Sequence, residues 1–77
     1  MIKKTLNLNE VVKIQKFVSS ASIQNYDIDV ISGRYIIDAK SIMGIFSLDL
    51  SKPINILIHA DEVEAKDFLD VIKNFEV

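Results

Sequence analysis

The spacing of apolar residues in this chain alternates between the period of a strand and that of a helix. Residues 3–8 alternate and predict a strand, with Leu6 and Leu8 on one face. Apolar residues recur at helical spacing over residues 10–20, and Asn9 is placed to cap that helix. The buried stripe that this spacing predicts consists of Val11, Ile14, Phe17, Val18 and Ala21.

A hairpin and a short helix are expected in the middle of the chain. Residues 26–31 and 34–38 both alternate, and the turn signal Ser32-Gly33 lies between them. A second run with helical spacing begins at Ser41. The Ser41 hydroxyl can accept a hydrogen bond from a free backbone N–H one turn further along, so we expect it to cap a short helix.

The last third of the chain predicts a strand and a final helix. Residues 54–60 are the most hydrophobic strand candidate, and Asp61 with Glu64 forms a capping-box pattern after it. The resulting order, strand–helix–strand–strand–helix–strand–helix with right-handed crossovers, lays the helices on one face of a four-stranded antiparallel sheet. We therefore expect an α/β (α+β) open-faced sandwich in which residues 1–77 form one domain. Its expected core consists of Phe17, Ile28, Ile36, Ile56, Phe68, Leu69 and Ile72.

The short helix carries too many apolar side chains to bury all of them. Successive residues project about 100° apart around a helix, so these side chains spread over most of its circumference. One side can pack on the core, and the other has to face water or a partner. We expect at least two of Ile42, Met43 and Phe46 to be accessible and to form a partner-binding patch. The apolar residues of this run are Ile42, Met43, Ile45, Phe46 and Leu48.

The segment 40–48, which reads K-S-I-M-G-I-F-S-L, resembles the regulatory-serine segment of HPr. HPr is the small phosphocarrier protein of the bacterial sugar phosphotransferase system, and it has the element order derived above. The resemblance implies an HPr-like fold over nearly the whole chain. In the family the matching serine is phosphorylated by a dedicated kinase in many Gram-positive bacteria, and the product binds a transcriptional regulator. Ser41 is therefore a candidate phosphorylation site, and this role is compatible with its alternative role as a simple helix cap.

The resemblance fails at the place where HPr proteins carry their phosphorylatable histidine. In the family that residue lies in a G-[LI]-H-A-R-P-A segment, where the first strand meets the first helix. Here residues 6–13 read L-N-L-N-E-V-V-K, which is shorter and contains no His, Arg, Pro or Gly. Alignment through Ala21-Ser22 puts Glu10 at the histidine position, where a carboxylate repels an incoming phosphoryl group. We expect this phosphorylation site to have been deleted.

His59 is the only histidine in the chain and lies near the end of the last predicted strand. It is either a substitute phosphoryl acceptor or a surface residue on a half-exposed strand. The second interpretation is favoured, because no arginine or helix N-terminus is near it in sequence. The carboxylates of the chain match no calcium loop, so we expect no metal and no cofactor. Those considered were Asp27, Asp29, Asp61, Glu62 and Glu64.

Composition narrows the function classes further. Nine basic and eleven acidic residues give a net charge of −2, which disfavours nucleic-acid binding. The absence of cysteine excludes disulfides and thiolate metal sites, and no apolar stretch is long enough for a membrane span or a signal peptide. We expect a cytoplasmic, bacterial, non-enzymatic module that binds a protein partner through Ile42, Met43 and Phe46, with Ser41 as a switch. The alternatives are a phosphocarrier with an atypical acceptor, and an unrelated small α+β domain that uses its sheet for oligomerisation.

Overall fold

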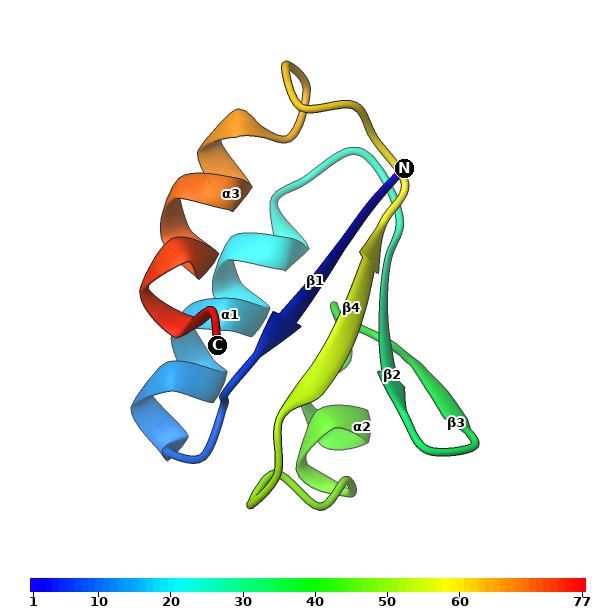
Figure 1. Ribbon diagram of the computed structural model, residues 1–77, viewed down its shortest axis with the longest axis vertical. Coiled ribbons are helices and arrows are strands. Elements are labelled where there is room, and N and C mark those ends of the chain that lie inside the picture. The colour runs from blue at the N-terminus through cyan, green and yellow to red at the C-terminus, as the bar shows by residue number, and fades with distance from the viewer.

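The chain follows the predicted order of elements in a computed structural model that describes residues 1–77 (Figure 1). The boundaries differ from the expected ones by a few residues, as is usual where strands and helices fray. None of the helices has the length and apolar character needed to cross a membrane. The elements are β1 (Ile2–Leu6), α1 (Val11–Ser22), β2 (Ile28–Ser32), β3 (Tyr35–Asp38), α2 (Ile42–Phe46), β4 (Ile54–Ile58), α3 (Lys66–Ile72) and the 3₁₀ turn η1 (Lys73–Phe75).

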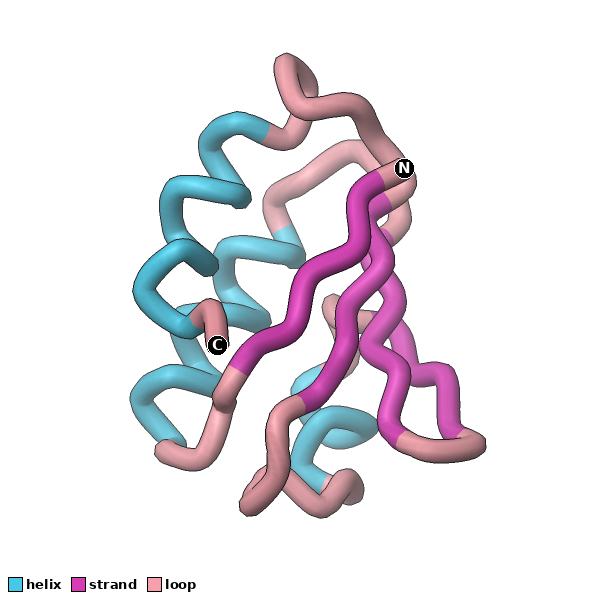
Figure 2. The backbone as a smooth tube through the Cα atoms, in the orientation of Figure 1, coloured by secondary structure: helices cyan, strands magenta, loops and turns pink.

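The four strands form one antiparallel sheet in the order β1-β4-β2-β3. Alternate residues of β4 point to the helices, so Ile54, Ile56 and Ile58 are buried while the residues between them face the other side. All helices lie on one side of the sheet, and its other side is open (Figure 2). The predicted open-faced sandwich is confirmed.

The core lies between this sheet and the helices α1 and α3. Phe17 from α1 and Phe68 from α3 are fully buried, and their rings lie 5.8 Å apart at an angle of 54°. This tilted arrangement is one that aromatic pairs prefer. Ile28, Ile56 and Ile72 are fully buried as predicted, and the partly buried Leu69 packs against the rim of the core.

Two residues predicted to be buried are exposed. Ile36 is 68% exposed, because β3 pairs it with Ile31 on the open face. Its neighbour Ile37 pairs with the buried Val30 and faces the helices instead. Val11 is 56% exposed, because the first turn of α1 lies beyond the end of β1 (Figure 1). The other four residues of the α1 stripe are buried as predicted.

The start of the last helix differs from the prediction. Asp61 does accept a hydrogen bond at Oδ1 from the Glu64 backbone N–H, at 2.8 Å. However, residues 62–65 form a turn, and α3 begins only at Lys66. The Asp61 cap therefore closes the turn that leads into the helix and does not cap the helix itself.

The two edge strands of the sheet differ in whether another segment of the chain pairs with them. Residues after η1 return along β1: Asn7 N donates to Phe75 O at 2.8 Å, and Val77 N donates to Thr5 O at 3.1 Å. An isolated bridge pairs Leu6 with Glu76. No segment pairs with the outer edge of β3. One edge is thus covered by the chain's own last residues and the other is free.

Tyr26 brings a polar group into the core without a partner. The residue is buried at the end of the connection from α1 to β2, and its hydroxyl makes no hydrogen bond. Burial raises the pKa of the Tyr26 hydroxyl, and the carboxylates of Glu64 and Asp67 add to that rise.

Candidate functional site

Ser41 caps the short helix α2 as predicted. Its backbone is extended, with φ −104° and ψ 99°, and its Oγ accepts a hydrogen bond from Gly44 N at 3.3 Å. The other end of the helix is closed in a similar way, because Ser47 Oγ donates to Gly44 O at 2.6 Å. A helix of five residues satisfies few of its own backbone groups, so these two side chains stabilise both of its ends.

Gly44 allows α2 to lie close against β3. A Cβ at this position would come within 2.6 Å of Ile37 Cγ2 and 3.2 Å of Ser41 Oγ. A larger residue would therefore push the helix away from the strand. Ile45 is the only buried residue of the helix and is fully buried.

The remaining apolar side chains of α2 are exposed. Ile42 is 38%, Met43 79% and Phe46 46% exposed, so the expectation that at least two of them are accessible is confirmed. We refer to these three residues as the short-helix patch. Leu48 is half-buried against the core. These apolar side chains stay exposed because, in so short a helix, only Ile45 points toward the core.

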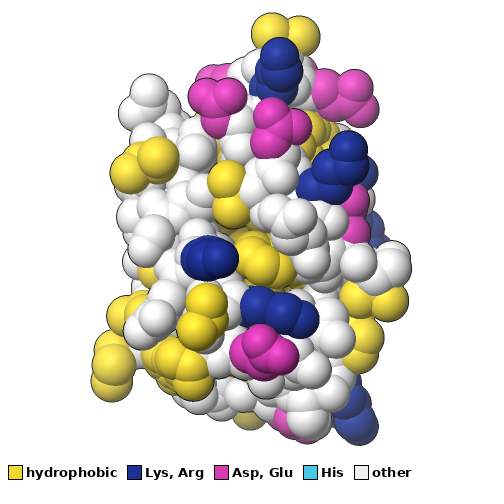
Figure 3. Space-filling view, turned by 90° about the vertical axis from the view of Figure 1, so that its left-hand side faces the viewer, with side chains coloured by type: hydrophobic (Ala, Val, Ile, Leu, Met, Phe, Trp, Pro, Cys, Tyr) yellow, Lys and Arg dark blue, Asp and Glu magenta, His cyan; other side chains and the backbone are white.

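Two further apolar side chains are exposed at the start of α1. Val11 and Val12 are both more than half exposed there, and α1 contacts α2. Hydrophobic side chains gather on the lower part of the face that the helices form (Figure 3). The sequence predicted Val11 in the core, so its exposure is not what the sequence indicates.

The junction between β1 and α1 differs from the expected one. The residue before the helix is Glu10, which is exposed and whose side chain makes no capping hydrogen bond. The predicted cap Asn9 is wrong: its Oδ1 accepts from Lys13 Nζ at 3.3 Å and not from a backbone N–H. Asn7 Oδ1 is buried here without a partner. Residues 6–13 at this junction contain one carboxylate, Glu10, and no histidine.

His59 follows β4 on the open face of the sheet, on the side where Leu57 points. Its Nε2 lies 2.8 Å from Asp29 Oδ2 on β2, and its backbone N donates to Asp27 O. The sequence analysis missed this contact between residues that are 30 positions apart. The alternation of β2 gave a partial signal, since it placed both aspartates on the open face. The sheet separates His59 from α2, so the structure does not bring His59 and Ser41 together.

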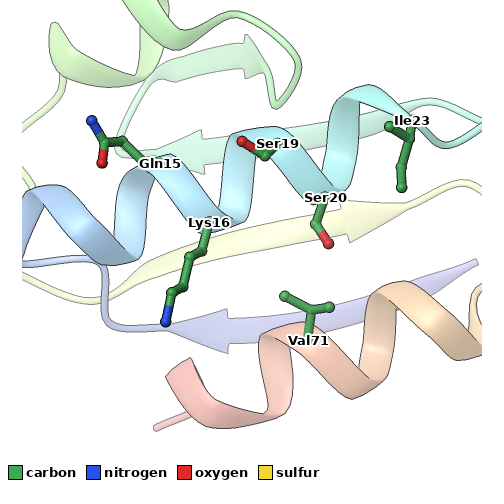
Figure 4. Close-up of a pocket in the computed structure, with 6 residues that line it drawn as sticks. All are labelled: Gln15, Lys16, Ser19, Ser20, Ile23 and Val71. Atoms are coloured by element: carbon green, nitrogen blue, oxygen red, sulfur yellow. The ribbon is translucent and has the colours of Figure 1, made fainter.

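A shallow hollow of about 430 Å³ lies between α1 and α3 (Figure 4). Its walls are mostly the carbon atoms of surface side chains, and Lys16 is its only charged residue. The hollow holds no pair of titratable groups that could transfer a proton or bind a metal. The lining residues are Gln15, Lys16, Ser19, Ser20, Ile23 and Val71.

The chain resembles known proteins over nearly all of its length. Residues 11–76 match the PTS-HPr family model, described as the PTS HPr component phosphorylation site. No curated protein sequence matches the chain. The crystal structure of HPr-C-His from Thermoanaerobacter tengcongensis has a similar fold, with a TM-score of 0.74 and 26% sequence identity. The similarity covers 96% of this chain and 93% of that chain. The sequence match and the fold agree, and the chain belongs to the PTS HPr family.

Proposed function

We propose that this chain is a regulatory, protein-binding member of the HPr family that lacks the histidine phosphocarrier site. The observation that carries the proposal is the exposure of the short-helix patch beside the Ser41 hydroxyl. Protein partners are common to the family, and what is proposed here is the particular surface and its switch. In this proposal the protein acts in the bacterial cytosol and catalyses no reaction itself.

The short-helix patch has the chemistry of a protein contact. Methionine is flexible and polarisable, and aromatic residues are frequent anchors in interfaces. Because Ile45 alone holds α2 on the core, the exposed side chains are free to contact a partner without a change in the fold. The neighbouring Val11 and Val12 enlarge the apolar area that such a partner could cover.

Ser41 is suited to switch this contact. Its side chain is exposed, and phosphorylation would add about −1.5 to −2 charges at the border of an apolar patch. Phosphate oxygens could still accept the hydrogen bond from Gly44 N that the hydroxyl now accepts. The adjacent Lys40 is held in place, because its Nζ donates to Gln24 O at 2.9 Å. A partner that needs a dry apolar contact would then be lost, and one that carries basic residues would be gained.

The β1–α1 junction argues against histidine phosphotransfer in this proposal. A phosphoryl carrier needs an accessible nucleophile surrounded by donors that stabilise the transferred charge. Glu10 instead places an exposed carboxylate at the start of α1. Its charge would repel a phosphorylated donor protein at the point where contact is needed.

One observation favours a second candidate, phosphotransfer through His59. When Nε2 carries the proton and donates it to Asp29, the lone pair of Nδ1 is available for attack. The electrostatic surroundings oppose it. Asp27 lies directly opposite His59, because its backbone O accepts from His59 N, and neither ion pair of the molecule brings a lysine or arginine to this histidine. We therefore rank this function second.

Two phosphorylation assays separate the candidates. Incubation with phosphoenolpyruvate and the first phosphotransfer protein of the system should leave no acid-labile phosphate on the chain. Incubation with ATP and the kinase that modifies HPr on serine should add one acid-stable phosphate, and Ser41→Ala should abolish it while Ser47→Ala should not. Phosphate on His59 at the rate of an ordinary HPr protein would overturn the proposal.

The binding proposal is tested with matched truncations. Met43→Ala and Phe46→Ala should each weaken binding to an HPr partner protein by at least about 1 kcal/mol, which is roughly fivefold. Val63→Ala removes an even more exposed apolar side chain from the turn before α3 and should leave binding unchanged. Equal affinities for all three variants would show that the short-helix patch is not the contact surface.

A further inference from the structure

The outer edge of β3 presents backbone groups that no other segment satisfies. Adjacent residues in an antiparallel strand direct their N–H and C=O groups to opposite sides. Ala39 N donates to Ile28 O, and His59 N donates to Asp27 O. These bonds show that Ile28, Val30 and Ser32 direct their N–H and C=O groups toward β3, whereas Ile31 directs its groups toward β4. Ile36 lies opposite Ile31, so its peptide groups do not bond to β2. Ile36 therefore directs both of its peptide groups away from the sheet.

The strand β3 is short, at four residues, but nothing else about this edge prevents strand pairing. Edge strands are usually protected by lysine, proline, a bulge or a covering segment. The β3 sequence, Y-I-I-D, contains only strand-favouring residues and one acid, and both Tyr35 and Ile36 are exposed. The opposite edge, by contrast, is covered by residues 75–77.

Two unpaired charges of opposite sign flank the free edge. Arg34 precedes β3 and Asp38 ends it, and neither takes part in an ion pair. Asp38 also lies directly across from Asp29, and like charges in that position destabilise a sheet. Asp29 has a partner in His59, whereas Asp38 only accepts a hydrogen bond from Lys40 N. The arrangement leaves Asp38 without a cation.

We propose that two copies of this chain pair through β3, antiparallel, with a two-fold axis at Ile36. The register follows from the alternation, because an outward-facing residue must lie opposite an outward-facing residue of the other copy. With Ile36 opposite Ile36, the two copies exchange two hydrogen bonds at the axis. Asp38 N–H of each copy then faces Arg34 C=O of the other.

The side chains complement one another in this register. Arg34 of each copy lies opposite Asp38 of the other, so each Asp38 gains a cationic partner and the interface contains two ion pairs. Ile36 meets its own counterpart on the open face, and Tyr35 covers the half-buried Ile37 of the other copy on the helix face. A two-fold interface must be self-complementary, and the four-residue edge of β3 meets this requirement. Because α2 packs against β3, the dimer places both short-helix patches on the same side of one continuous sheet.

Charge exchange tests this dimer. The full chain should show a concentration-dependent monomer–dimer equilibrium in sedimentation velocity. Arg34→Asp and Asp38→Arg should each raise the dissociation constant by at least about fivefold, because each places like charges opposite one another at both ends of the edge. The chain with both substitutions should recover wild-type association. An equimolar mixture of the two single variants should form a heterodimer, which binding of an unrelated peptide strand would not produce.

A proline variant controls for changes in the fold. The N–H of Ile36 points outward, so Ile36→Pro removes no hydrogen bond within the monomer. This variant should keep the wild-type circular dichroism and remain monomeric at every concentration. The proposal is wrong if wild type and Ile36→Pro sediment alike as monomers at millimolar concentration, or if the two charge variants do not combine.

Discussion

Two of the three strand-to-helix junctions begin their helices in different ways. In both, an extended residue precedes the helix: Glu10 before α1 and Ser41 before α2. Ser41 caps its helix through the side chain, and Glu10 does not. The long helix α1 buries four side chains, whereas α2 buries only Ile45. The difference teaches that burial replaces local hydrogen bonds where a helix is long, and that a helix of five residues depends on its caps.

The same difference bears on the proposed function. In the junction before α1 the Glu10 side chain makes no capping bond, so Glu10 can change at little cost to the fold. The junction before α2 combines a cap, a close contact at Gly44 and an exposed apolar patch within six residues, Ser41 to Phe46. If the proposed binding function holds, Ser41 to Phe46 serve both folding and binding.

The largest expected effect concerns the single buried residue of α2. Ile45→Ala should lower the free energy of unfolding by about 2–5 kcal/mol, because it removes the only side chain that holds the helix on the core. Val12→Ala at the start of α1 should change it by less than about 0.5 kcal/mol, because that side chain is exposed. Urea denaturation measures both. Similar values for the two variants would contradict the comparison.

A smaller effect is expected at the contact between α2 and β3. Gly44→Ala should destabilise the chain by about 1–3 kcal/mol, because the added methyl group meets Ile37 at 2.6 Å. In an unstrained helix the same substitution would stabilise it. In a chain that carries Ile37→Ala, which removes the facing Cγ2 methyl group, Gly44→Ala should cost less stability than it does in wild type. An unchanged or higher stability of Gly44→Ala would show that α2 is not tightly seated.

The caps themselves provide the most direct comparison. Ser41→Ala should cost about 1 kcal/mol, because it removes the acceptor of the Gly44 N–H. Glu10→Ala should cost less than about 0.5 kcal/mol, because its side chain makes no capping bond. Thermal unfolding of both variants under identical conditions gives the difference. A larger loss for Glu10→Ala would reverse the assignment of the two junctions.

The smallest effect is expected for a hydroxyl that bonds to nothing. Tyr26→Phe should leave the stability at neutral pH unchanged or raise it, in contrast to Ser41→Ala. The folded-state pKa of Tyr26 is raised, so the folded chain retains the phenolic proton where the unfolded chain releases it. Stability should therefore fall as pH rises above about 10, and Tyr26→Phe should reduce that fall. An identical alkaline decline in both chains would show that Tyr26 is solvated.

Element order was predictable because each element carries its own period, and the Ser41 cap because its partner lies three residues away. The sequence could not predict which of Ile36 and Ile37 faces the core, because both residues are apolar and an alternating pattern does not say which face of the strand is buried. The turn before β3 determines which of the two side chains is buried. Gly33, with φ +58°, begins a two-residue loop that pairs Ser32 with Tyr35, and a shift of one residue would exchange the faces.

For the candidate site, too, local features were predictable from the sequence and contacts between distant residues were not. Exposure of the short-helix patch follows from angular spread on one helix, which is a local property. The contact between His59 and Asp29 depends on the pairing of β2 with β4, which no local pattern specifies. The free edge of β3 likewise depends on strand order, since sequence cannot tell which strand lies outermost.

The pairing of β1 with β4 and with the last residues also affects how the chain folds during synthesis. β1 is made first, yet its neighbours in the sheet are residues 54–58 and 75–77. At about 5–20 residues per second, its unpaired edges wait several seconds on the ribosome before those residues emerge. The hairpin β2–β3 with α2 can form meanwhile, because its contacts are local. β1 can therefore complete its pairing only last, although it is translated first, and a nascent chain that stalls before residue 54 exposes an unpaired strand to chaperones and proteases.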